Sequence, residues 1–254
     1  MGKLIKYEIR KDVSTYISVF ALLVCVQLYL VVSLVTKSEK HVAISSLLFV
    51  LIGIAGIGIV MLIGVVSYTR ELGSKYSYMT FMLPRTTKQI VGAKYVTLLI
   101  VTIVSTAVYC GFLLIDLKLA ESIYKEQFDI ARMIDNMIKS VTGKSVTDVA
   151  LGLLATVIGI WINIIVTVSF GYVAVTLSFS LLSGKKGKIP LSLLFFIIIR
   201  VVSFILINRL PTFDYGSAFL DIVRGAWPSY LVELILIVCS FFGVAKLLEK
   251  KVSL

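Results

Sequence analysis

Charged residues are scarce in this sequence. They make up only 15% of its 254 residues, whereas 59% are hydrophobic. Soluble domains are typically about 45–50% apolar. The composition therefore excludes a soluble globular domain and predicts an integral membrane protein.

Cysteine and histidine are also rare, with three cysteines and one histidine in the whole sequence. Cys25, Cys110 and Cys239 each lie within an apolar run, and no two of them have CxxC spacing. This pattern supports neither a disulfide framework nor a zinc site. His41 stands alone in a short loop, so we expect no metal and no cofactor bound to this chain.

The motifs of common hydrolases and nucleotide-binding proteins are missing. There is no HExxH, no GxSxG and no complete GxxxxGK[ST]. Gly143, Lys144 and Ser145 resemble the end of a phosphate-binding loop, but Ile138 occupies the position of its first glycine. We therefore expect that the chain is not an enzyme. Energy for any uphill transport would come from a separate subunit or an ion gradient.

Long apolar runs are the main feature that is present. A helix needs about 20 apolar residues to cross a hydrocarbon core. We expect an all-α polytopic membrane protein that forms one domain with six transmembrane helices. These spans are expected at about 14–36, 43–67, 95–115, 149–182, 189–208 and 229–248.

The fourth apolar run, 149–182, is longer than one perpendicular crossing requires. It leaves two possibilities open, one long tilted helix or two spans joined by a turn. No proline or polar break interrupts the run, which favours one helix.

The first 13 residues are basic and amphipathic. Ile5, Ile9 and Val13 recur at helical spacing, which predicts an interfacial helix over 1–13. The basic residues gather on another side, next to this stripe: Lys3, Lys6, Arg10 and Lys11. This arrangement suits contact with anionic lipid headgroups. A second amphipathic surface helix is expected within 119–148.

Six spans place both termini on the same side of the membrane. That side then holds most of the basic residues and few of the acidic ones. By the positive-inside rule, the termini are cytoplasmic and the chain is a multi-pass protein of the cell inner or plasma membrane. The net charge of +11 is thus explained by the membrane surface, and no nucleic-acid partner is expected.

Three polar residues inside the expected spans form a possible intramembrane site: Asn163, Arg200 and Glu233. A charge at this depth is costly unless it is paired or reaches water. Asp116 and Glu233 are both conceivable partners for Arg200. The sequence does not choose between them.

The segment 70–94 between the second and third spans is polar and basic. Pro84 cannot continue a helix, so a short helix is expected to end near Met82. Thr86 and Gln89 have capping-box spacing, which predicts that another helix starts at Thr86. Four residues of the first helix recur at helical spacing and form a stripe that either packs on this protein or contacts a partner: Tyr76, Met79, Thr80 and Leu83.

These features together resemble the ABC-2 type permease subunits, and most closely the small permeases of bacterial exporters for peptide antibiotics and lantibiotics. The resemblance rests on six spans, a basic N-terminus and a proline- and glycine-broken segment before the last span. It also rests on Glu71-x-Gly73, Leu83-Pro84-Arg85 and Lys94 between spans two and three.

The resemblance implies that the helix over 74–83 is a coupling helix seated in a groove of an ATPase. The residues that it implies for contact with this cytoplasmic partner are Glu71, Tyr76, Met79, Thr80, Leu83, Pro84, Arg85 and Lys88. Two permeases, identical or homologous, would pair with two ABC ATPase subunits, which bind the ATP and magnesium. The cargo would be a peptide, an antibiotic or an amphipathic lipid-like molecule. The length of the fourth run, 149–182, departs from the family pattern.

Two other functions remain open. A stand-alone ion-coupled carrier would need no ATPase. A non-transporting sensory or scaffold subunit would bind a cytoplasmic partner without ATPase motifs.

Overall fold

The computed structural model describes residues 2–73, 86–124, 146–182, 187–211, 225 and 227–252. At 146–153 and 250–252 it describes the backbone without the side chains. Regular structure in these residues is entirely helical. The helices are α1 (Gly2–Val35), α2 (Glu39–Gly73), α4 (Thr87–Ile123), α6 (Val146–Leu181), α7 (Lys188–Asn208) and α9 (Trp227–Val252). All six are long and apolar enough to cross a membrane. The expected all-α fold with six candidate spans is thus confirmed.

Several helices extend beyond the apolar runs that predicted them. α1 begins at Gly2, so residues 2–13 continue into the first span without a separate helix before it. α4 passes through Asp116 and Lys118 and ends only at Ile123. Hydropathy marks the part of a helix suited to hydrocarbon, whereas lysine, glutamate and similar residues favour continued helix outside it. Whether the start of α1 lies among headgroups stays a prediction.

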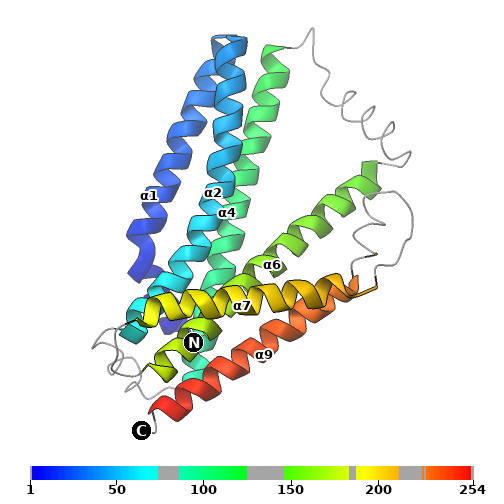
Figure 1. Cartoon of the computed structure of the whole chain (residues 1–254). Helices are drawn as coiled ribbons and strands as arrows, with labels where there is room; N and C mark the ends of the chain where they lie inside the picture. The colour runs from blue at the N-terminus through cyan, green and yellow to red at the C-terminus, as the bar shows by residue number, and fades with distance from the viewer. Residues whose placement is uncertain are drawn as a thin grey trace.

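The long fourth run forms a single helix, α6, of 36 residues. At about 1.5 Å per residue it measures about 54 Å, well beyond the hydrocarbon thickness. In Figure 1 it runs obliquely to α1, α2 and α4. The interpretation as one long helix is therefore correct. The expected helix over 74–83 and residues 125–145 of the second surface helix lie outside the described residues.

The six helices form two units of three. α1 packs against α2 and α4, whereas α7 and α9 both pack on α6. The units lie together at the end that holds both chain termini and diverge toward the other end (Figure 1). Both termini therefore lie at one end of the bundle, as an even number of spans requires. The assignment of that end to the cytoplasm stays a prediction.

A buried apolar core joins the two units at the shared end. Its side chains come from α2, α4, α6 and α9: Val60, Tyr68, Leu72, Val91, Leu98, Val168, Tyr172, Val175, Phe179, Val244 and Leu248. The rings of Tyr68 and Tyr172 are 4.7 Å apart between centroids. A second, smaller cluster around Phe49 lies within the first unit, where its ring stacks on that of Tyr109. We call the larger cluster the junction core.

Gly171 allows α2 and α6 to approach closely in the junction core. A Cβ atom placed there would lie only 2.7 Å from Cγ2 of Val65. Valine has a short side chain that is restricted to few rotamers in a helix, so it cannot easily move aside. A glycine at this position is therefore required by the packing of the two units.

We predict that Gly171→Ala lowers the stability of the folded chain by about 1–3 kcal/mol, because the added methyl group overpacks the junction. The measurement is the thermal unfolding of the purified protein in detergent. Gly243→Ala is the matched control, since a Cβ atom there meets nothing within 4 Å. An unfolding temperature for Gly171→Ala equal to that of the unmodified chain would contradict the prediction.

Candidate functional site

The segment expected to contact a partner is flanked by two well-defined helix ends. α2 ends at Gly73 and α4 begins at Thr87. The Oγ1 atom of Thr86 accepts a hydrogen bond from the backbone N–H of Gln89 at 3.3 Å. The expected helix start at Thr86 is therefore confirmed. Force applied to residues 74–85 would reach the molecule through these two ends.

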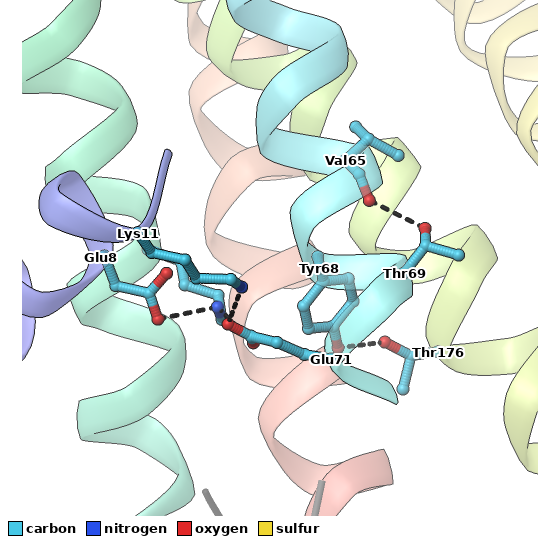
Figure 2. A network of polar contacts seen from close by, with 8 residues as sticks. Glu8, Lys11, Val65, Tyr68, Thr69, Glu71 and Thr176 are labelled. Carbon is cyan, nitrogen blue, oxygen red and sulfur yellow. Dashed lines mark hydrogen bonds and ion pairs between the residues drawn. The ribbon is translucent and has the colours of Figure 1, made fainter. Parts of the chain in front are cut away.

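A cluster of alternating charges ties these ends together. The Nζ atom of Lys94 on α4 lies 2.8 Å from Oε1 of Glu8 on α1 and 2.5 Å from Oε2 of Glu71 on α2. The Nζ atom of Lys11 lies 2.6 Å from Oε1 of Glu71. Figure 2 shows Glu8, Lys11 and Glu71 converging on one another from α1 and α2. We call Glu8, Lys11, Glu71 and Lys94 the charge cluster.

Burial makes this cluster a strong constraint on the three helices. The Lys94 side chain is only 5% exposed, and that of Glu71 is 15% exposed. Taking a lone charge out of water costs several kcal/mol, so a buried ammonium needs carboxylates held close to it. Glu8 and Lys11 are three residues apart and thus share one face of α1. The cluster therefore fixes how the ends of α1, α2 and α4 lie relative to one another.

The charge cluster is connected to the second unit through Tyr68. The Lys94 ammonium lies 5.8 Å from the centre of the Tyr68 ring. The Tyr68 hydroxyl lies 2.7 Å from Oγ1 of Thr176 on α6. Figure 2 shows the two side chains pointing toward one another. Thr176 donates its own hydroxyl proton to the Tyr172 carbonyl, so Tyr68 is the donor to Thr176. This hydrogen bond crosses the junction between the units.

A further contact joins the start of α4 to the end of α9. The Thr87 hydroxyl donates to Oε1 of Glu249 at 2.8 Å. The first turn of α4 is therefore attached to the second unit as well, and its second turn carries Lys94. Movement of the start of α4 would therefore be transmitted to both units.

Among the residues expected to bind a partner, Glu71 is paired within the chain, Lys88 is exposed, and the other six lie outside the described residues. Glu71 has both carboxylate oxygens in ion pairs within its own chain. Its expected contact with a partner stays a prediction. Lys88 is exposed on the first turns of α4. Tyr76, Met79, Thr80, Leu83, Pro84 and Arg85 lie outside the described residues.

Sequence reasoning did not bring Glu8, Lys11 and Lys94 into one site. The sequence patterns assign Lys11 to the expected interfacial helix and Lys94 to the motif between spans two and three, and they give Glu8 no role. The signal in the sequence was that Lys94 comes directly before an apolar run, while Glu8 and Glu71 lie near the ends of two other spans. That signal does not specify which charges meet, because the partners are far apart in the sequence.

The intramembrane polar residues do meet. The Nη2 atom of Arg200 on α7 donates to Oδ1 of Asn163 on α6 at 3.2 Å. The Nδ2 atom of Asn163 donates to Oε1 of Glu233 on α9 at 3.2 Å. Asn163 thus bridges a base and a buried acid within the second unit. We call these three residues the polar bridge.

Asp116, the other conceivable partner of Arg200, belongs to the first unit. Its Oδ1 atom accepts a hydrogen bond from Nε2 of Gln27 at 2.5 Å, which joins α4 to α1. Helices in lipid gain little from apolar contact with one another, so such polar contacts help to hold them together. Asp116 therefore serves helix packing in the first unit.

The side chains of the two sites can pair charges and exchange protons. Within the residues that the structure describes, no group of three or more histidine, cysteine, aspartate or glutamate side chains is placed to hold a metal ion. The charge cluster can transmit displacement between helices. The polar bridge offers one carboxyl group within the helical bundle.

Comparisons with protein-family models, with curated proteins and with solved structures find no match to this chain. The resemblance to ABC-2 type permeases therefore stays a prediction from the residues quoted above.

We predict that Lys94→Met lowers the free energy of unfolding by about 3–5 kcal/mol, because two buried carboxylates lose their shared cation. Chemical unfolding of the purified chain in detergent would measure the change. Lys246→Met, at an exposed position of α9, removes the same charge and is expected to leave stability nearly unchanged. Equal stability of the two variants would show that the charge cluster does not hold the helices.

Proposed function

We propose that this chain is the transmembrane permease subunit of an ABC exporter whose separate ATPase subunits drive it. The observation that carries the proposal is the charge cluster. It joins α1 and the two helix ends that flank residues 74–85, and it lies beside the junction core. A protein that receives force at this segment needs such a connection.

The proposed mechanism is mechanical. Closure of two ATPase subunits on ATP displaces the expected coupling helix over 74–83. α2 and α4 carry that displacement to the charge cluster, and Tyr68 and Thr87 carry it on to α6 and α9. The two three-helix units then change their relative orientation about the junction core. Packed interfaces of this kind tend to switch between discrete arrangements.

The remaining parts of the proposal come from the family resemblance. Two permeases, identical or homologous, assemble with two ATPase subunits that bind ATP and magnesium. The cargo is a peptide, an antibiotic or an amphipathic lipid-like molecule. The assembly lies in the inner or plasma membrane with the termini and the 70–94 segment in the cytoplasm, in agreement with the excess of basic residues there.

We predict that the double variant Met79→Glu, Leu83→Glu no longer forms a complex with the ATPase that co-purifies with the unmodified chain. Two carboxylates would be placed on the apolar stripe that docks. The measurement is co-purification from membranes, together with cargo-stimulated ATP hydrolysis by the reconstituted complex. The exposed Lys118→Glu change lies near the opposite end of α4 and is the control.

A second variant separates docking from transmission of force. Glu71→Gln should keep the ATPase bound but reduce cargo transport per ATP hydrolysed, because Lys94 and Lys11 lose their shared carboxylate. Unchanged complex formation in the Met79, Leu83 variant would defeat the docking claim. Capture of only a partner without ATPase motifs would favour a sensory or scaffold role instead.

The polar bridge supports a second candidate, an ion-coupled carrier. Glu233 is 6% exposed, and its Oε2 atom is a buried oxygen without a hydrogen-bond partner among the residues that the structure describes. Buried acids of this kind serve as proton sites in secondary transporters. The bridge lies wholly within the second unit, however, where Asn163 also gives Arg200 a hydrogen-bond acceptor.

The carrier function predicts transport by the chain alone in liposomes with a proton gradient and no ATP. Glu233→Gln would then abolish uptake, because the amide cannot exchange a proton. Leu231→Gln, an exposed change on the same helix, is the control. Transport that requires the ATPase and ATP, and that survives Glu233→Gln, would reject this candidate.

A further inference from the structure

A long apolar groove lies between α1, α2 and α4. Its volume is about 480 Å³. It follows α1 from Ile9 to Leu23, and it is lined on the other side by 53–60 of α2 and 100–109 of α4. Lining residues such as Ile17 and Phe20 are 60% and 48% exposed, so the groove is open along its length to the outside of the bundle.

Glycine creates part of this space. A Cβ atom at Gly56 would lie 3.8 Å from Cγ1 of Val19, which is an ordinary contact distance. α2 thus stands away from α1 at this level without a side chain between them. The gap is available to a flexible apolar group from outside the chain.

The position of the groove matches one leaflet of a bilayer. The stretch from Ile9 to Leu23 spans about 21 Å at about 1.5 Å per residue. Of this, the part from Ser14, where the first apolar run begins, measures about 14 Å. Half of a hydrocarbon core of about 30 Å is about 15 Å. The groove is therefore long enough to reach from the expected membrane surface near Ser14 to the middle of the bilayer.

Two basic side chains stand at the surface end of the groove. Lys6 precedes Ile9 by three residues and Arg10 precedes Val13 by three, which places both at one edge of the grooved side of α1. Asp12 follows Ile9 by three residues and lies at the opposite edge, beside Tyr16. Both are exposed, and no ion pair joins either of them to another described residue. Lys11, by contrast, turns toward Glu71.

We propose that this groove binds one acyl chain of an anionic phospholipid, with the headgroup phosphate held by Lys6 and Arg10. The apolar lining accepts the hydrocarbon, and the two cations complement the phosphate charge. Such a lipid covers the side of α1 that carries neither the charge cluster nor contacts to the second unit. The inference does not depend on the proposed transport function.

Native mass spectrometry of the full chain, released from detergent, tests the proposal with phosphatidylglycerol and phosphatidylcholine of identical acyl chains. The expected result is one tightly retained phosphatidylglycerol and weaker retention of phosphatidylcholine. Lys6→Gln with Arg10→Gln should weaken phosphatidylglycerol binding about thirty-fold, as two basic residues near an anionic surface would. Lys40→Gln with Lys118→Gln removes the same charge at the opposite end of the first unit and should change nothing.

Substitution of a groove glycine tests where the acyl chain lies. Gly56→Leu fills the groove and should reduce bound lipid of either kind, whereas Gly58→Leu projects from the same helix into open space and should not. Equal binding of the two lipids by the unmodified chain would overturn the role of Lys6 and Arg10. Full lipid retention by Gly56→Leu would overturn the groove as the site. The proposal would also be overturned if the unmodified chain formed a dimer without bound lipid and Gly56→Leu dissociated that dimer, because a second copy of the chain would then occupy the groove.

Discussion

The buried ammonium of Lys94 is the constraint on which the arrangement of the first unit depends. Lys94 directly precedes the apolar run of α4, yet its side chain is almost completely removed from solvent. Such a group is tolerated only with opposite charges beside it, and these come from two other helices. The requirement sets the relative positions of the ends of α1, α2 and α4. Residues 74–85 are consequently attached to a fixed frame at both of their ends.

The second important feature is that the two three-helix units are joined mainly at one end. The junction combines an apolar core with the Tyr68–Thr176 hydrogen bond, and Trp161 of α6 adds a hydrogen bond to Thr106 of α4 at 3.1 Å. Toward the far end each unit is held by its own polar contacts, such as Gln27–Asp116 in the first. A small rotation at the junction would therefore become a larger displacement at the far end. This geometry suits a protein that alternates between two arrangements.

Local sequence patterns predicted local structure well. The apolar runs located six membrane-length helices, and the spacing of Thr86 and Gln89 located the start of α4. The cost of an intramembrane charge singled out Arg200, and the structure shows it bonded to Asn163. Helix ends were predicted less well, as at Ile123, because polar residues that favour helix continue the backbone hydrogen bonding beyond the apolar run.

The sequence by itself determined that this chain suits a membrane, that it has six candidate spans and that its basic residues gather at one end. Each of these follows from composition and periodicity along the chain. Only the tertiary structure decided that Glu8 and Glu71 share Lys94, that Asn163 bridges Arg200 to Glu233, and that a groove runs beside α1. These contacts depend on how helices distant in the sequence rotate and pack. Hydropathy does not encode that rotation, since many faces of each helix are equally apolar.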